Sequence, residues 1–373
     1  MAVLASAYHG PPQLTLSRAF TEWTADPAMI ALIVVLGAAY LCGVYRVRRR
    51  GAEWKTGRTV AFCGLGLGFL VIATMSWVGV YYGILFYARA TQTVLLVLLT
   101  PLFLAMGKPI TLFAEVFPAA GVPVVKIIRS RVAKVLTFPA VTSLTLVGVP
   151  MVMYFTSWYT ATFHSGAARE LTYLALMAPG YLFFWTLLRV DPVPKEYPYG
   201  VGMWITAAEV VGDAFFGLAI IADTNLIAGP YYHAVGWPYG PTLATNQVLG
   251  GGIIWILGDA VGLPFLAVQL IQMMRADKAE AAEIDAELDA KDAARAARKR
   301  ARQAERAALA AWRSGEEYAP DAASGTIADG TVADATVANG AVADDTHEDH
   351  AGEDEERPWW EDDPRFTERF RKA

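Results

Sequence analysis

Residues 86–106 read FYARATQTVLLVLLTPLFLAM, a stretch that contains one charged residue. A hydrocarbon core about 30 Å thick needs roughly 20 apolar residues of α-helix, so this stretch is long enough to cross a bilayer. Six more stretches meet the same test: residues 28–45, 59–80, 138–157, 170–188, 201–222 and 248–274. Their apolar residues are continuous and do not alternate with a period of two, which favours helices. The sequence therefore predicts an all-α, polytopic membrane bundle of about seven helices.

Charge separates this apolar body from the rest of the chain. Only 18% of the residues are charged, against about 25% in a soluble globular protein. Residues 1–274 hold 16 Lys and Arg and 11 Asp and Glu, whereas residues 275–373 hold 15 and 25. The basic residues stand beside apolar spans and form no single wide face, so we expect no nucleic-acid partner. The two cysteines, Cys42 and Cys63, both lie in apolar runs, which excludes a disulfide framework.

The loops predict the orientation. Thirteen of the 16 basic residues of the body fall on one side of the predicted membrane, beginning with the run of residues 46–50, RVRRR. Because Lys and Arg are enriched in cytoplasmic loops, this side is expected to be cytoplasmic. The N-terminus then lies outside and, after seven spans, the C-terminus lies inside. We expect a multi-pass protein whose surroundings are the lipid bilayer of the cell (plasma) membrane.

Four regions are predicted along the chain. Residues 1–27 form an external segment, residues 28–274 the membrane domain, residues 275–315 a charged cytoplasmic helix, and residues 316–373 a disordered acidic tail. The tail repeats every five residues over 326–345 and ends in an aromatic motif, for which we predict partner binding through Trp359, Trp360, Phe366 and Phe370. Residues 109–134 read either as an amphipathic segment on the cytoplasmic leaflet or as an ordinary basic loop.

Charged residues inside the predicted spans are candidate functional residues, because charge in a membrane is costly. Glu209 and Asp213 lie four residues apart on one helix face, and Asp259 lies about halfway along the last span. Arg89 and Arg169 stand at the external starts of two spans. These residues either line a polar cavity that opens outward or form buried pairs that fix helix packing. Gln247 precedes three glycines and either caps that helix or reaches the cavity.

No catalytic arrangement is visible in the sequence. It contains no Ser-His-Asp set, no glycine-rich phosphate loop and no HExxH motif, and none of its five histidines lies in a predicted span. We therefore expect a protein that is not an enzyme.

Residues 28–274 resemble the CtaG-type cytochrome c oxidase assembly factors. The resemblance is carried, in chain order, by Leu85-Phe86, Gln92, Leu95-Leu96, Pro101-Leu102, Gly107 to Thr111, Gly180 to Trp185, Asp191 to Pro194, Ala214 to Gly217, Gln247 to Ile253 and Trp255 to Gly258. It implies the same seven-span topology and a role in maturing a haem–copper oxidase by helping copper reach its centre. Oxidase subunits or other assembly factors are the implied partners.

The resemblance also implies copper ligands that this chain lacks. The family has a His-Met-x-x-His motif where this sequence has Arg89-Ala-Thr-Gln92-Thr93, and further histidines where it has Arg169, Tyr173, Ala175 and Asp213. Imidazole binds copper well, whereas a guanidinium group cannot. Copper is thus a cofactor by resemblance only, and Arg89, Arg169 and Asp213 are expected to form an ion-paired plug in its place.

Two functions are consistent with these observations. The first is an assembly factor for cytochrome c oxidase that acts as a scaffold or as a divergent copper handler. The alternative is a transporter of a small solute or ion that uses the outward polar cavity. Against the transporter, the sequence shows no internal repeat in its membrane part.

Overall fold

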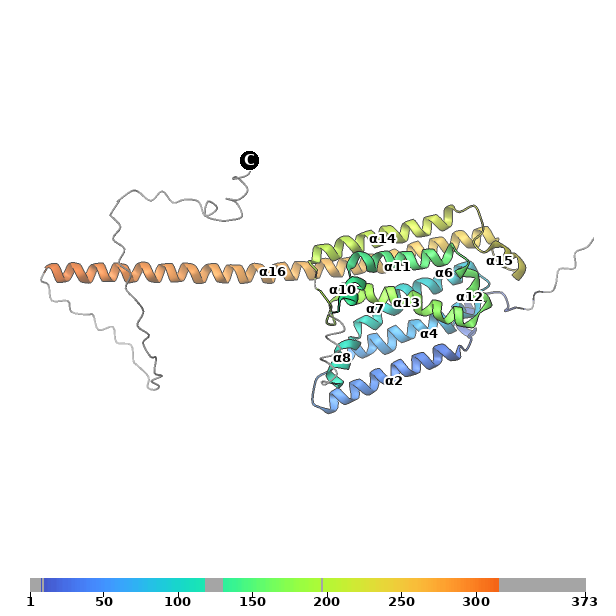
Figure 1. Ribbon diagram of the computed structural model, residues 1–373, viewed down its shortest axis with the longest axis horizontal. Helices are drawn as coiled ribbons and strands as arrows, with labels where there is room; N and C mark the ends of the chain where they lie inside the picture. Colours follow the sequence, from blue (N-terminus) through green and yellow to red (C-terminus); the bar gives the residue numbers. More distant parts are fainter. Residues whose placement is uncertain (1–7, 9, 118–129, 196, 315–373) are drawn as a thin grey trace, which may run out of the picture. The chain divides into compact units, whose positions relative to one another are not determined.

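The computed structural model describes residues 8, 10–117, 130–195 and 197–314, and within these ranges every regular element is a helix (Figure 1). This confirms the predicted all-α class. In chain order the helices are α1 (Leu16–Thr21), α2 (Pro27–Arg49), α3 (Thr56–Thr59), η1 (Val60–Gly66), α4 (Leu67–Met75), α5 (Trp77–Tyr81), α6 (Phe86–Val94), η2 (Leu95–Leu99), α7 (Thr100–Met106), α8 (Pro109–Val116), α10 (Arg131–Leu136), α11 (Pro139–Tyr154), α12 (Trp158–His164), α13 (Gly166–Leu188), α14 (Tyr199–Ala222), α15 (Gly229–Val235) and α16 (Leu243–Ser314).

Six segments of the described chain are long and apolar enough to cross a membrane. They are α2, residues 56–81, residues 86–116, α13, α14 and the apolar part of α16. The helices α11 and α12, which meet at an angle of 67°, make a seventh if they are counted as one span. The chain is therefore a multi-span membrane protein with six or seven crossings.

Local sequence explains where these helices begin and turn. Asp26 caps α2 by accepting a hydrogen bond from the Met29 amide at 3.2 Å, and Pro27 occupies the first helical position. Ser165 caps α13 in the same way. Between α7 and α8 the backbone of Lys108 is left-handed, with φ 54°, and Pro109 then starts the new helix. The apolar stretch of residues 86–106 is therefore followed by a turn at Lys108, and α8 begins as a separate helix.

Two of the spans contain π-helical turns. The segment η1 follows α3 directly, and η2 follows α6 directly. The segment η1 packs against α7, and η2, which continues directly into α7, packs against α13. A π-turn contains one more residue than an α-helical turn and often marks a functional position. In this protein η2 comes immediately after the helix that carries Arg89, Gln92 and Thr93.

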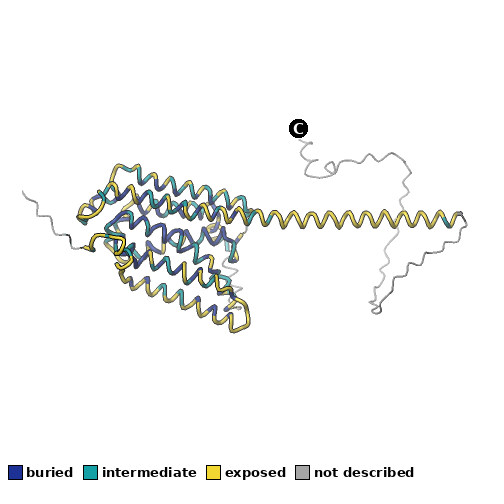
Figure 2. Tube along the Cα trace, turned by 180° about the vertical axis from the view of Figure 1, so that it is seen from behind, coloured by how far each residue is buried: buried dark blue, intermediate teal, exposed yellow. Residues whose placement is uncertain are grey.

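The apolar core lies between the central helices, and α2 stays mostly exposed (Figure 2). Leu70, Leu96, Leu176 and Ile220, from four different spans, are completely buried. The outward side chains of α2 include Val34 and Val35, which are 60% and 63% exposed. Such an apolar outer surface is the expected one for a helix that faces lipid.

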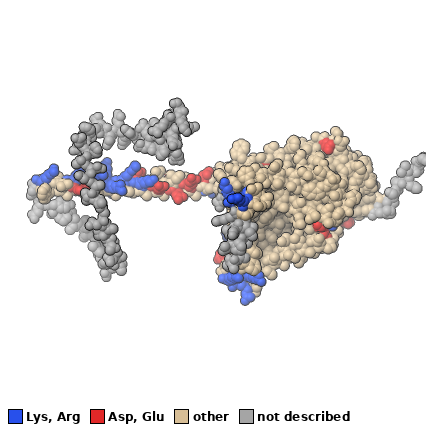
Figure 3. Space-filling model, in the orientation of Figure 1, with Lys and Arg blue, Asp and Glu red and all other residues tan. Residues whose placement is uncertain are grey.

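The chain divides into two units, residues 1–295 and residues 296–373. In the first unit the view in Figure 3 shows a largely uncharged surface, with Lys and Arg gathered at the end where α2 finishes. In the second unit the described residues, 296–314, are helical and almost all exposed. The predicted aromatic motif of the tail, with Trp359, Trp360, Phe366 and Phe370, lies outside the described residues, as do residues 118–129 of the predicted amphipathic segment.

Candidate functional site

Arg89 lies at the centre of a buried polar group. It belongs to the first turn of α6, and its side chain is completely buried. Its Nη1 donates to Gln92 Oε1 at 2.7 Å, and its Nη2 donates to the sulfur of Met153 at 3.3 Å. The guanidinium carbon lies 5.7 Å from the ring centre of Tyr82 and 5.8 Å from that of Tyr159, within the range of cation–π attraction. No carboxylate in the described chain lies within ion-pair distance of Arg89.

Gln92 and Thr93 connect Arg89 to three other helices. Gln92 Nε2 donates to the carbonyl of Ala73 in α4 at 2.8 Å and to the hydroxyl of Tyr173 in α13 at 3.2 Å. Thr93 Oγ1 donates to the Arg89 carbonyl at 3.0 Å and lies 3.1 Å from the hydroxyl of Tyr154 in α11. The structure thus brings four of the predicted site residues, Arg89, Gln92, Thr93 and Tyr173, into one hydrogen-bonded group.

Buried tyrosines enclose this group, and none of them was a sequence candidate. Tyr154, Tyr159 and Tyr232 are 2%, 1% and 5% exposed. The hydroxyls of Tyr159 and Tyr232 lie 2.7 Å apart, so one donates a hydrogen bond to the other. Burial raises the pKa of Tyr232, in the loop helix α15, above its ordinary value, so this hydroxyl keeps its proton at neutral pH. In the sequence, the high density of aromatic residues near these helix ends is the one signal that points to this cluster of tyrosines.

Arg169 belongs to a different group at the ends of α2 and α13. Its Nη2 lies 3.4 Å from Asp26 Oδ2 and 2.9 Å from Glu170 Oε1. The Arg169 side chain is about one-third exposed, whereas that of Asp26 is buried. Arg169 therefore ties the start of α13 to the cap of α2, and the acid that it pairs with across the fold is Asp26, which was not a sequence candidate.

Glu209 and Asp213 are buried on the face of α14 that packs against α16. A Cβ atom at Gly258 would lie 2.5 Å from Asp213 Oδ2, and one at Gly262 would lie 3.4 Å from Glu209 Oε2. The two glycines of α16 thus leave the space that the two carboxyl groups fill. Glu209 Oε1 and Asp259 Oδ1 have no hydrogen-bond partner among the described residues. The ion-paired plug of Arg89, Arg169 and Asp213 is not formed within the described ranges, because Arg169 pairs with Asp26 and Glu170.

A small cavity lies between the arginine group and the acidic pair. It measures about 20 Å³, and both Thr93 and Asp213 line it. Such a volume has room for about one water molecule. Gln247 lies elsewhere: its Nε2 donates to three carbonyls at 3.2 Å, and its Oε1 accepts from the Ile227 amide at 2.8 Å. Gln247 thus holds the loop between α14 and α15.

Copper ligands of the usual kinds do not come together in the described residues. No group of three or more His, Cys, Asp or Glu side chains is placed to hold a metal ion there. Cys42 is exposed and Cys63 is half-buried, and both are free thiols. The positions where the family resemblance implies histidines hold Arg89, Thr93 and Tyr173, and each of these side chains contacts another helix, through Met153, Tyr154 and Gln92 respectively. These residues do not fit a bound copper ion.

The residues that carry the family resemblance meet in pairs. Asp191 accepts hydrogen bonds from the amides of Ile110 and Thr111 at 3.2 and 2.9 Å. The motif that begins at Asp191 therefore caps α8, the helix that begins within the motif of residues 107–111. A Cβ atom at Gly180 would lie 2.9 Å from Pro101 Cγ, and one at Gly217 would lie 2.6 Å from the Gly251 carbonyl oxygen. The shared residues therefore act in this chain as the close contacts that hold the bundle together.

These features define a helical membrane protein whose polar residues are enclosed within the bundle. Residues 38–276 match the family model described as cytochrome c oxidase caa3 assembly factor. The chain belongs to that family.

Curated relatives of the chain come from mycobacteria. Uncharacterized proteins of Mycobacterium bovis and Mycobacterium tuberculosis are each 29% identical over 290 residues, and one of Mycobacterium leprae is 28% identical. The match covers 76% of this chain but only 44% of each relative, so the chain spans less than half of their length. No solved structure matches the chain.

Proposed function

We propose that this protein is a non-enzymatic assembly factor for cytochrome c oxidase in the plasma membrane, and that it acts as a scaffold for oxidase subunits or other assembly factors. The observation that carries the proposal is the match to the family over residues 38–276, together with the packing role of the shared residues. The match covers the helical bundle, whereas Arg89, Thr93 and Tyr173 occupy positions at which the family resemblance implies metal ligands. A scaffold needs the bundle but not those ligands.

In this proposal a partner protein inserts the copper, and this protein does not bind the metal itself. Arg89 is completely buried among Gln92, Met153 and two tyrosine rings, and its Nε has no hydrogen-bond partner among the described residues. A chain with this interior supports oxidase maturation by holding a subunit or a copper carrier in place. Transport receives less support, because the cavity beside Thr93 and Asp213 has room for about one water molecule.

The exposed part of α16 supports partner binding. Arg298, Lys299, Arg302, Arg306 and Arg313 lie within an arc of about 100° on one side of the helix, and all five are exposed. None of them forms an ion pair with another described residue. A helix face of this kind favours a partner with an acidic surface. We expect charge reversal at Arg302 and Arg306 to reduce recovery of that partner.

The proposal is tested by deleting the gene and measuring the copper content and activity of cytochrome c oxidase in isolated membranes, with and without added copper. We expect a specific loss of active, copper-loaded oxidase that the intact gene restores. Asp213→Ala should restore less, because it empties the space at the contact of α14 and α16. Asp277→Asn removes one exposed carboxylate from α16 and should restore fully. Normal oxidase in the deletion strain would refute the proposal.

A further inference from the structure

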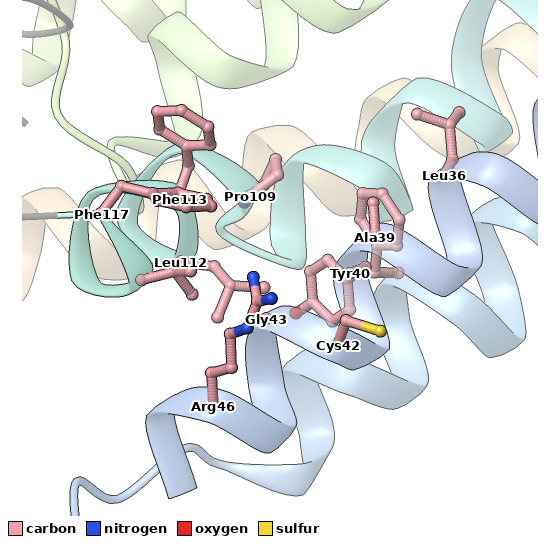
Figure 4. A pocket seen from close by; sticks show the side chains of 12 residues that line it. Leu36, Ala39, Tyr40, Cys42, Gly43, Arg46, Pro109, Leu112, Phe113 and Phe117 are labelled. Carbon is pink, nitrogen blue, oxygen red and sulfur yellow. The ribbon is translucent and has the colours of Figure 1, made fainter. Parts of the chain in front are cut away.

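A groove runs between α2 and α8, away from the buried polar groups. Its volume is about 330 Å³, within the range of small-molecule sites. Figure 4 shows Leu36 toward one end and Arg46 at the other. The described part of the lining is almost entirely apolar and includes Ala39, Cys42, Phe113 and Phe117, and Arg46 is its one charged residue.

Arg46 differs from the arginines that follow it. Arg48 donates to the Trp54 carbonyl at 3.2 Å, and Arg50 donates to the carbonyls of Glu115 and Val116 at 3.0 and 3.1 Å. Arg49 lies over the ring of Tyr45 at 5.6 Å. The Arg46 side chain is exposed and has neither a hydrogen bond nor an ion pair with any described residue. A cation that has no partner among the described residues therefore stands at the end of an apolar groove.

The dimensions of the groove match one leaflet of a bilayer. Leu36 and Arg46 are ten residues apart on α2, which is about 15 Å along a helix and about half of a hydrocarbon core roughly 30 Å thick. Several residues that line the groove are themselves accessible: Cys42 is exposed, and Phe113 and Phe117 are each 45% exposed. The groove thus opens toward the lipid and reaches the headgroup region where the arginines stand.

We propose that this groove is a specific site for an anionic phospholipid, with one acyl chain along α2 and the phosphate group paired with Arg46. Charge complementarity selects the headgroup, because a cation near the membrane surface contributes attraction to anionic lipids. The apolar lining selects the acyl chain. In a membrane, burial of its methylene groups is favourable only where they pack more closely against the protein than against other lipid chains.

Native mass spectrometry of the detergent-purified full chain tests the site. The protein is incubated with equal amounts of dioleoyl-phosphatidylglycerol and dioleoyl-phosphatidylcholine, and the lipids that stay bound are counted. Ala39→Phe places a ring in the groove, and Ala38→Phe adds the same volume on an exposed neighbouring position that does not line it. Arg46→Gln removes the cation, and Arg49→Gln is its matched control.

We expect the wild-type chain, Ala38→Phe and Arg49→Gln to retain one phosphatidylglycerol in preference to phosphatidylcholine. Arg46→Gln should bind phosphatidylglycerol about fivefold more weakly, the factor that one basic residue contributes near a membrane surface. Ala39→Phe should lose the bound lipid. Equal retention by Ala39→Phe and Ala38→Phe, or equal binding of the two lipids by the wild-type chain, would overturn the proposal. Thermal unfolding of each variant shows that it remains folded.

Discussion

Arg89 shows how a membrane bundle accommodates a cation without a carboxylate. Its charge is stabilised by the amide oxygen of Gln92 in its own helix, by the thioether of Met153 in α11, and by the rings of Tyr82 and Tyr159. The sequence marked Arg89 as a candidate because charge in a span is costly. Its partner Met153 lies 64 positions later in the chain, and no local pattern links the two.

Gln92 is predicted to matter more for stability than its neighbour Thr91. Gln92→Ala removes the bonds to Arg89, Ala73 and Tyr173, and leaves the buried guanidinium short of an acceptor. We expect a loss of about 2–4 kcal/mol in the free energy of unfolding. Thr91→Val removes only a bond to the Tyr87 carbonyl in its own helix, and should cost about 0.5 kcal/mol or less. Thermal unfolding in detergent measures both, and equal midpoints would contradict the role given to Gln92.

At the scale of helices, glycines determine how closely α14 and α16 approach. A Cβ atom at Gly251 would lie 2.7 Å from both the Gly217 carbonyl oxygen and Ile221 Cγ1, whereas one at Gly252 would meet nothing within 4 Å. Small residues at such contacts let two membrane helices pack backbone to backbone. The run of three glycines at residues 250–252 is visible in the sequence, but the sequence does not show which of them makes this contact.

Substitution of these adjacent glycines should therefore have opposite effects. Gly251→Ala forces the two helices apart and is expected to cost about 1–3 kcal/mol. Gly252→Ala meets open space and gains the higher helix propensity of alanine, so it should be neutral or stabilising by up to about 1 kcal/mol. The difference between their unfolding midpoints in detergent is the measurement. A destabilised Gly252→Ala would argue against the packing described for α16.

The predicted spans agree closely with the helices because their signal is local. The predicted limits 28–45 and 201–222 correspond to α2, Pro27–Arg49, and α14, Tyr199–Ala222. The turn at Lys108 and the π-turns were not predicted, since they depend on contacts with other helices. The same holds for the site: burial of Glu209 and Asp213 follows from span hydropathy, but the space for them depends on Gly258 and Gly262.

For the whole molecule, the distribution of basic residues predicts the orientation in the membrane. The arginines from Arg46 to Arg50 gather at one end of the bundle, which the positive-inside rule assigns to the cytoplasm. Alkaline phosphatase, which is active only outside the cytoplasm, should then be active when inserted after Tyr239 and inactive at the C-terminus. Green fluorescent protein at the C-terminus should be fluorescent. The reverse pattern would require the opposite orientation.

The enclosure of Arg89 has a consequence for the order of events during synthesis. At 5–20 residues per second, Met153 follows Arg89 out of the ribosome after roughly 3–13 s. For that time the helix of Arg89 exists without the thioether of α11, the ring of Tyr159 and the hydroxyl network that reaches Tyr173. The nascent chain must therefore keep this guanidinium in water or at the membrane surface until α11, α12 and α13 have been made. The span that carries Arg89 can therefore reach its final depth in the membrane only after these three helices have been made.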